Sequence, residues 1–160
     1  MRIGVLSDTH IPDRYEEIPS PLLKDLEKCD LVIHAGDFTS LEYYETLKAL
    51  KPLKAVLGNL DAPDLRPILK EKEVFTVEKF KIGLIHGFGQ PQTVLENVKK
   101  TFNGSCDLVI FGHTHNAFNK KIQKTVYFNP GSPTDKIFTT TNSYGIIEIG
   151  KTIQTKIIKL

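Results

Sequence analysis

Short apolar runs recur along the chain, and each one ends in glycine or a small polar residue. Continuous apolar runs of this length are typical of strands that are buried on both faces of a sheet. Helical patterns lie between them, and this alternation favours a parallel sheet. The predicted strands are Arg2–Leu6, Leu31–Ala35, Leu53–Leu57 and Asp107–Phe111. The predicted helices are Pro21–Lys28 with Ser20 as N-cap, Leu41–Leu50 with Ser40 as N-cap, and Pro91–Phe102.

The remaining segments alternate apolar and polar residues, as half-exposed antiparallel strands do. They pair into three hairpins across short turns, whereas the first half of the chain has the parallel pattern. The simplest assembly is an α/β fold of two packed sheets with helices outside, in a single domain that spans residues 1–160. The predicted hairpins are Glu73–Glu78 with Lys81–His86, Ala117–Ile122 with Thr125–Phe128, and Tyr144–Ile149 with Thr152–Lys159.

Composition adds mainly exclusions. The 21 basic and 19 acidic residues give a net charge of +2, without a basic block, so nucleic acid is not an expected partner. No stretch approaches the ~20 apolar residues of a membrane span, and the run after Met1 is too short for a signal peptide. We therefore expect a cytoplasmic protein. Cys29 and Cys106 lack metal-site spacing, and we expect both to be small buried residues.

Metal-binding side chains stand at the ends of five predicted strands, where α/β folds gather their ligands. Mixed carboxylate, imidazole and amide donors suit Mn²⁺, Fe²⁺, Ni²⁺, Co²⁺ or Zn²⁺. In an extended backbone, the two donors of an Asp-x-His or His-x-His pair would lie on the same side. The set is larger than one tetrahedral zinc can use, which predicts two metal ions. The candidate ligands are Asp8, His10, Asp37, Asn59, His86, His113 and His115.

Four other features have simpler interpretations. His34 lies inside a predicted strand, where a core or supporting role is expected, and Asp61 is expected to stabilise its turn. Arg14 follows the first ligand loop, and a surface salt bridge is the expected role for it. The segment Asn129–Pro133 is expected to form a turn that supports or borders the site.

The ordered motifs make the chain resemble a known family. Asp8-x-His10, Gly36-Asp37, Gly58-Asn59-x-Asp61, His86-Gly87 and Gly112-His113-x-His115 resemble those of the calcineurin-like metallophosphoesterase superfamily. The chain length and the Asn129–Ser132 segment resemble its small single-domain branch, the YfcE-type phosphodiesterases. The resemblance covers nearly the whole chain and implies a four-layer αββα sandwich of two mixed sheets.

The resemblance also implies roles for the candidate ligands. One metal would be held by Asp8, His10 and His115, and the other by Asn59, His86 and His113, with Asp37 bridging both. Asn59, His86 and His113 would also be the catalytic positions. Members of this branch work best with Mn²⁺ or another transition metal, and many form dimers or larger homo-oligomers.

The implied reaction is hydrolysis of a small-molecule phosphodiester by a metal-bridging hydroxide. Many superfamily enzymes carry a histidine, thought to protonate the leaving group, where this chain has Leu60. We therefore expect the best activity on leaving groups that depart without protonation. Two alternatives stay open: a non-catalytic protein-binding scaffold, as in the retromer subunit of this superfamily, and a phosphomonoesterase or nuclease at the same metals.

Overall fold

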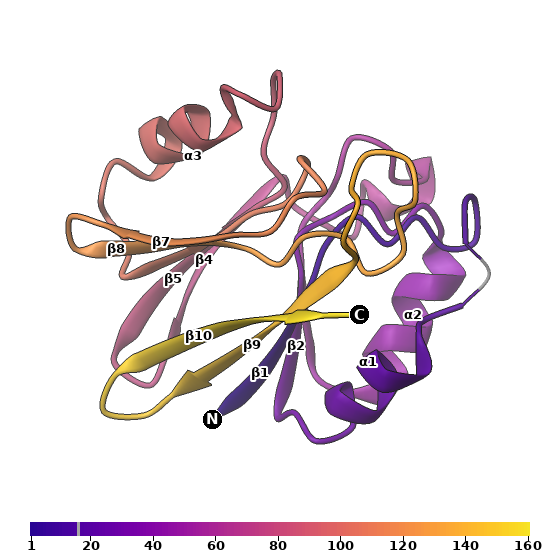
Figure 1. Cartoon of the computed structure of the whole chain (residues 1–160), viewed down its shortest axis with the longest axis horizontal. Helices are drawn as coiled ribbons and strands as arrows, with labels where there is room; N and C mark the ends of the chain where they lie inside the picture. The colour runs from indigo at the N-terminus through magenta and orange to yellow at the C-terminus, as the bar shows by residue number, and fades with distance from the viewer. Residues whose placement is uncertain (16) are drawn as a thin grey trace.

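The protein, described as a computed structural model over residues 1–15 and 17–160, is built on two mixed five-stranded sheets (Figure 1). The first sheet has the strand order β10-β9-β1-β2-β3 and the second β4-β5-β6-β8-β7. The first sheet and its helices comprise β1 (Arg2–Leu6), α1 (Ser20–Leu26), β2 (Leu31–His34), α2 (Leu41–Leu50), β3 (Leu53–Ala55), β9 (Ser143–Ile149) and β10 (Ile153–Lys159). The other elements are the 3-10 helix η1 (Pro63–Leu65), β4 (Lys72–Val77), β5 (Phe80–Ile85), α3 (Val94–Phe102), β6 (Leu108–Ile110), β7 (Phe118–Ile122) and β8 (Thr125–Asn129).

Both sheets have a parallel centre and at least one antiparallel edge. In the first sheet β1, β2 and β3 are parallel, and the C-terminal hairpin β9–β10 pairs antiparallel with the other edge of β1. In the second sheet β5, β6 and β8 are parallel, with β4 and β7 antiparallel at the two edges. The chain is therefore not divided into a parallel half and an antiparallel half, because its last hairpin returns to pair with its first strand.

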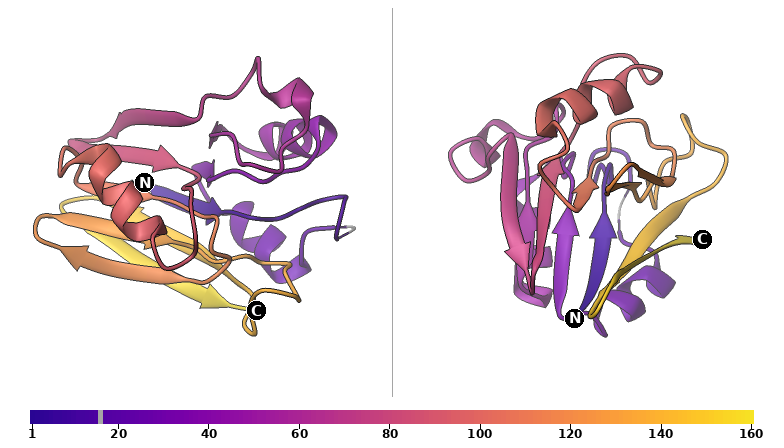
Figure 2. Two further views of the ribbon diagram at one scale, coloured as in Figure 1. Left: turned by 90° about the horizontal axis from the view of Figure 1, so that it is seen from above. Right: turned by 90° about the vertical axis from the view of Figure 1, so that its left-hand side faces the viewer.

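Three apolar layers hold the sandwich together. Leu22 and Leu26 of α1 and Leu47 of α2 pack on one face of the first sheet. Between the sheets lies a core that includes Ile33, Ile147, Leu84, Leu108 and Phe128. On the far side of the second sheet, a further cluster contains the apolar face of α3, formed by Val94, Val98 and Phe102. Figure 2 shows α3 on one side of the stacked sheets and α1 and α2 on the other, which confirms the predicted four-layer αββα sandwich.

Helix ends differ in part from the expectations. The Ser40 cap of α2 is confirmed, since its side chain accepts a hydrogen bond from the Tyr43 amide. The Ser20 cap is wrong: α1 begins at Ser20 itself, and Pro19 at the N-cap has no side-chain oxygen to offer. α3 begins at Val94 rather than at residue 91 and ends at Phe102, where the C-cap residue Asn103 has a left-handed φ of 45°. Both cysteines are buried free thiols, as expected.

The loops after β1, β2, β5 and β6 meet at one edge of the sandwich. Asp8 N donates a hydrogen bond to Gly36 O, and Gly112 N donates one to His86 O. These contacts join neighbouring strand ends within each sheet, as parallel packing requires. None of the helices in the described residues has the length and apolar character to cross a membrane.

Candidate metal centre

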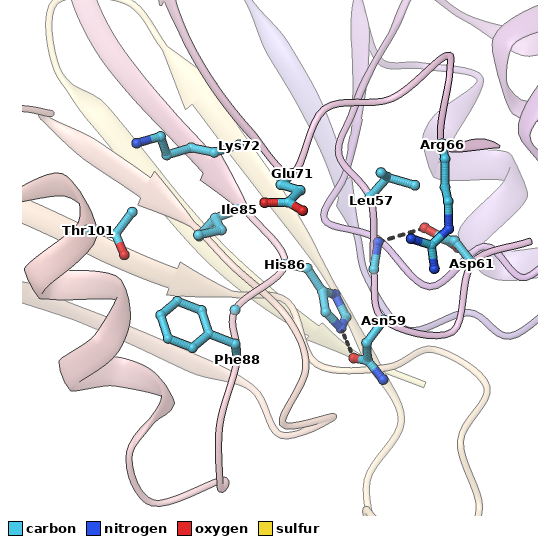
Figure 3. A pocket seen from close by; sticks show the side chains of 12 residues that line it. Leu57, Asn59, Asp61, Arg66, Glu71, Lys72, Ile85, His86, Phe88 and Thr101 are labelled. Carbon is cyan, nitrogen blue, oxygen red and sulfur yellow. Dashed lines mark hydrogen bonds between the residues drawn. The ribbon is translucent and has the colours of Figure 1, made fainter. Parts of the chain in front are cut away.

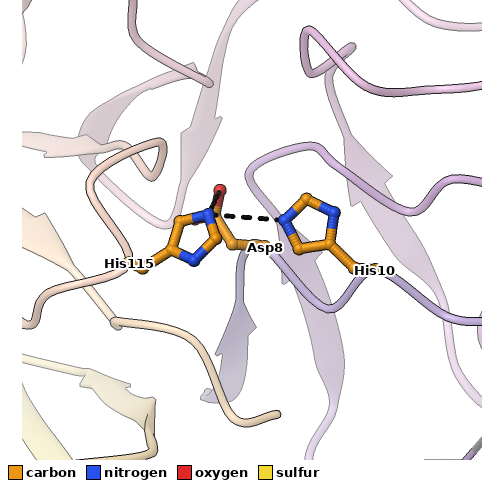
Figure 4. Close-up of side chains that lie close together, drawn as sticks. All are labelled: Asp8, His10 and His115. Atoms are coloured by element: carbon orange, nitrogen blue, oxygen red, sulfur yellow. Dashed lines mark hydrogen bonds and ion pairs between the residues drawn. The ribbon is translucent and has the colours of Figure 1, made fainter. Parts of the chain in front are cut away.

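Three of the predicted ligands form a buried group that we call the first cluster: Asp8, His10 and His115 (Figure 4). Their donor atoms all lie within 4.8 Å of one another. The Nε2 atom of His115 is 3.4 Å from Asp8 Oδ1 and 3.3 Å from His10 Nε2. Nitrogen and oxygen atoms whose lone pairs point at one common place are typical of a cation site. Without a cation or a shared proton between them, these lone pairs repel one another.

The second cluster consists of Asn59, His86 and His113, and it is more open to solvent. Asn59 Oδ1 lies 2.9 Å from His86 Nε2 and 3.0 Å from His113 Nδ1. His86 is 3% exposed, whereas His113 is half-buried and Asn59 is exposed. A ligand from solvent would therefore approach over this cluster rather than over the first.

Asp37 lies between the two clusters. Its Oδ2 atom is 3.7 Å from His10 Nε2 and 3.5 Å from His86 Nε2. Its Oδ1 atom accepts a hydrogen bond of 2.8 Å from the Leu60 amide, which fixes the carboxylate plane. One oxygen of Asp37 therefore faces one imidazole from each cluster.

Hydrogen bonds on the outer nitrogens set the direction of three imidazoles. His86 donates from Nδ1 to Ala35 O at 2.7 Å, so its Nε2 lone pair faces inward. His113 has the opposite arrangement: its Nε2 atom donates to Gly89 O at 2.9 Å, and Nδ1 faces the cluster. His115 donates from Nδ1 to Asp135 Oδ2 at 2.7 Å. Such outer partners are usual for metal-ligating histidines, because they fix the tautomer.

Asp135 was missed by sequence reasoning. It lies 20 residues beyond His115, in a loop whose Ser-Pro-Thr-Asp sequence indicates only turn chemistry. In the fold its carboxylate is buried, and it also accepts hydrogen bonds from the Ile137 and Phe138 amides. These hydrogen bonds, with that from His115, keep the pKa of Asp135 below its usual range although burial opposes them. No spacing in the sequence connects it to His115.

The burial and the hydrogen bonds of Asp8 show that the donor set fits a metal ion. Its side chain is fully buried, and Oδ2 accepts hydrogen bonds from Ser7 Oγ at 2.6 Å and His113 N at 3.0 Å. Its Oδ1 atom, the one that faces the first cluster, has no hydrogen-bond partner within the described part of the chain. Burial raises the pKa of this carboxyl to about 7, against the opposing charge of His115. A cation beside Oδ1 would satisfy the oxygen and stabilise the carboxylate.

The backbone places these donors in a way that differs from the expectation. Asp8, His10, His113 and His115 are not extended; their φ angles are 54°, 49°, 69° and 58°, in the left-handed region. Alternation along a strand therefore does not explain the pairs. His113 and His115 even point into different clusters, whereas Asp8 and His10 share the first one. Left-handed non-glycine residues are uncommon and gather at functional sites.

Two glycines are required by close approach. A Cβ on Gly58 would lie 2.0 Å from Asp37 Oδ1, and one on Gly112 would lie 1.7 Å from Ser7 Oγ. Both distances are far inside van der Waals contact, so a side chain at either position would displace a carboxylate or the hydroxyl that holds one. The glycines of the Gly-Asn and Gly-His motifs thus make room for the ligand loops to pack.

His34 supports the site from the core. Gly36 N donates to its Nδ1 atom at 3.2 Å, so Nε2 carries the proton and bonds Thr9 Oγ1 at 3.0 Å. The ring stacks on Phe38 with centroids 3.7 Å apart, and burial lowers the pKa of His34, which keeps it neutral. The expected core role is confirmed, since both ring nitrogens are occupied by loop residues.

Three further loop residues tie the ligand loops together. Asp61 accepts hydrogen bonds from the Phe38, Thr39 and Gly58 amides, so it stabilises its turn as expected. In the segment 129–133, Asn129 Nδ2 donates to Gly112 O at 2.9 Å, and Ser132 Oγ donates to Asp8 O at 2.7 Å. This segment therefore supports two ligand loops.

Arg14 has a different environment from the expected salt bridge. Its guanidinium carbon lies 5.8 Å from the centre of the Phe138 ring, in cation–π range. No carboxylate within the described residues forms an ion pair with it.

A two-sheet sandwich that gathers buried imidazole and carboxylate donors at one edge defines a protein of the metallophosphoesterase class. Residues 1–152 match the model of the calcineurin-like phosphoesterase superfamily domain, and the chain belongs to this family. Its relatives include a probable metallophosphoesterase of Methanothermobacter thermautotrophicus, 38% identical over 84% of this chain and 78% of that one. A phosphodiesterase of Methanocaldococcus jannaschii is 33% identical over 82% of this chain and 83% of that one.

Solved structures show the same fold. An archaeal phosphodiesterase superposes with a TM-score of 0.77 over 100% of both chains, at 29% identity. Vacuolar Protein Sorting 29 from Chaetomium thermophilum gives a TM-score of 0.79 over 100% of this chain and 97% of that one, at 21% identity, which shows the fold alone. The fold thus occurs in a phosphodiesterase and in a sorting protein.

Proposed function

We propose that this chain is a binuclear metal-dependent phosphodiesterase, in which the first cluster and the second cluster each hold a divalent cation and Asp37 bridges them. The position of Asp37 Oδ2, 3.7 Å from His10 Nε2 and 3.5 Å from His86 Nε2, carries the proposal. The unsatisfied Oδ1 of Asp8 supports it. Mn²⁺ is the proposed ion, with Ni²⁺, Fe²⁺, Co²⁺ and Zn²⁺ as substitutes. Two such ions would supply Lewis-acid chemistry, because they would lower the pKa of water enough to make hydroxide available near neutral pH.

The chain's own contribution is charge and orientation. Asp8 and Asp37 supply two negative charges against the cations, and the outer hydrogen bonds of the histidines hold the donors in place. Asn59 turns Oδ1 toward His86, and Figure 3 shows its amide nitrogen directed away from that ring. In this orientation the amide can donate a hydrogen bond to a phosphate oxygen as charge develops on it.

The leaving group decides which esters are good substrates. Leu60 is 46% exposed beside the second cluster, at the position where many family members have a histidine. It cannot donate a proton. We therefore expect fast turnover of aryl esters, whose phenolate departs without protonation, and slower turnover of alkyl diesters.

The test is hydrolysis of a bis-aryl phosphodiester by metal-stripped protein during titration with Mn²⁺. We expect turnover that appears with added metal and saturates near two ions per chain. Bound metal is counted in parallel by elemental analysis of the dialysed protein. Saturation at one ion with full activity would contradict the binuclear assignment.

Other outcomes separate the remaining alternatives. An absence of turnover with Mn²⁺, Ni²⁺, Co²⁺ and Zn²⁺ would favour the protein-binding scaffold. Vacuolar Protein Sorting 29 shares the fold, as this alternative requires. Turnover of aryl phosphate monoesters above that of diesters would favour a phosphomonoesterase. Faster cleavage of a single-stranded oligonucleotide than of the aryl diester would favour a nuclease. The sequence speaks against this alternative, because it has no block of basic residues to bind a phosphate backbone.

A further inference from the structure

A cavity of about 610 Å³ opens directly beside the second cluster (Figure 3). Asn59 and His86 form the end of its lining at the candidate metal centre. Its other walls come from the start of β4, the end of β5 and α3. The volume lies in the range of ~300–1,000 Å³ that is usual for small-molecule sites. A phosphate held at the second cluster would therefore direct one of its ester substituents into this space.

The cavity contains one exposed aromatic ring on a fixed backbone. Phe88 lines it and is 53% exposed. Its carbonyl oxygen accepts a hydrogen bond of 3.0 Å from Asn97 Nδ2 of α3, and the next carbonyl, Gly89 O, accepts one of 2.9 Å from His113 Nε2. The segment that carries the ring is thus tied both to a helix and to a candidate metal ligand. An apolar ring held toward solvent at this place can stack on a planar group of a bound molecule.

The polar residues of the cavity restrict what that group can be. Arg66, Glu71 and Lys72 line it as well, so two cationic donors and one carboxylate acceptor share the cavity with the aromatic ring. Figure 3 shows Arg66 and Lys72 on opposite sides of Glu71. An acyl chain would gain little from three charged neighbours, since it would desolvate them without offering hydrogen bonds. A planar ring with polar edges and hydroxyl groups can use both the aromatic face and the charged side chains.

We propose that this cavity binds a nucleoside-type substituent of the diester, with its base stacked on Phe88. The inference rests on the proposed function, because it assigns one ester arm of the same substrate. It makes the substrate class a small phosphodiester of a nucleoside, and it makes Phe88 a residue that determines specificity. The cavity has room for one such unit, and the chain has no basic track for a polymer.

Two substrates with the same leaving group test the inference. The p-nitrophenyl ester of thymidine monophosphate presents a base to the cavity, whereas methyl p-nitrophenyl phosphate does not. For the Mn²⁺-loaded protein we expect a higher kcat/KM on the thymidine ester. Phe88→Ala should remove this advantage, lowering kcat/KM for the thymidine ester by ~5–150-fold, the equivalent of ~1–3 kcal/mol per stacked base. The methyl ester should be hydrolysed as fast as by the unaltered protein.

Two further variants serve as controls. Phe88→Trp keeps an aromatic face and should keep the preference for the thymidine ester. Phe138→Ala removes another exposed ring, 61% exposed and 5.4 Å from the His115 ring, on the side of the first cluster. It should leave the ratio between the two esters unchanged. Thermal melting of each variant checks that the fold is intact.

The outcomes distinguish the two proposals. Turnover of the methyl ester without any advantage for the thymidine ester overturns the inference and leaves the phosphodiesterase intact. An equal loss on both esters in Phe88→Ala also overturns it. If neither ester is hydrolysed, the proposed function fails, and calorimetric binding of thymidine monophosphate decides the inference. Binding that Phe88→Ala weakens by ~5–150-fold supports the cavity assignment, whereas equal or absent binding overturns it.

Discussion

Replacing the carboxylate of Asp37 by an amide tests the bridging role most directly. In Asp37→Asn, the side-chain oxygen can still accept the hydrogen bond of 2.8 Å from the Leu60 amide. The amide nitrogen then occupies the place of Oδ2, 3.7 Å from His10 Nε2 and 3.5 Å from His86 Nε2. This nitrogen has no lone pair available for a cation. The substitution therefore removes one charge and one ligand atom at nearly constant shape.

Simple electrostatics gives the size of the effect. Two dications ~3.5–4 Å apart repel each other by ~18 kcal/mol at an effective dielectric constant of ~20. A carboxylate oxygen at a usual metal–oxygen distance of ~2.1 Å from both cations would attract each one by ~16 kcal/mol on the same scale. The bridging charge thus more than offsets the repulsion. Without it, we expect the protein to bind one metal ion or none, and to lose its turnover of aryl diesters.

The assay is elemental analysis of dialysed protein together with diester turnover at saturating Mn²⁺. Asp61→Asn is the matched control: it changes a buried aspartate in the same loops, one that accepts amide hydrogen bonds and is not a proposed ligand. It should lower stability by ~1–3 kcal/mol and still bind two ions. An Asp37→Asn protein that keeps two ions and full turnover would refute the bridging assignment.

Three other predictions, one of them with a control substitution, have definite expected results. Asp135→Ala should weaken Mn²⁺ binding at the first cluster by ~10–100-fold, measured by metal titration, without removing a ligand. Gly58→Ala should abolish activity, because its Cβ would lie 2.0 Å from Oδ1 of Asp37, the proposed bridging residue. As its control, Gly150→Ala should match the unaltered protein in the same assay, since a Cβ there has nothing within 4 Å. Tyr144→Phe removes the hydrogen bond of 2.7 Å that lowers the pKa of Asp25. A carboxyl whose pKa is lower in the folded state than in the unfolded state stabilises the fold at pH values above the unfolded pKa. In urea unfolding, the free energy of unfolding should therefore fall by ~1 kcal/mol at neutral pH. This difference should shrink as the pH falls through the folded pKa of Asp25.

Much of the fold could be predicted because it depends on local pattern. Nearly every strand and helix lies where its apolar period placed it, and the errors are at the ends, as for Ser20 and the start of α3. The antiparallel partner of β1 could not be predicted. The expected half-exposed alternation is present in β10, but it is wrong for β9, which is buried on both faces apart from Glu148 because it lies between β1 and β10. The pattern along these strands also does not indicate which sheet edge they join, and the pairing with β1 spans most of the chain.

The candidate ligands could be predicted for a different reason. Asp, Asn and His directly after buried strands are few in number, and the carboxyl ends of parallel strands share an edge. The extended-backbone argument for the His113–His115 pair was wrong, since both residues adopt left-handed φ angles. Local sequence does not encode that conformation for histidine; packing of the surrounding loops imposes it.

The sequence by itself determined the donor types, the glycines that let their loops pack, and the strand ends at which they stand. Only the tertiary structure decided which imidazole joins which cluster, that Asp37 lies between the clusters, and that Asp135 orients His115. His10 and His115 are separated by 105 residues, yet their Nε2 atoms lie 3.3 Å apart. Such contacts depend on how two sheets stack and how five loops pack at one edge. These are distances through space, and hydrophobic periodicity along the chain contains no information about them.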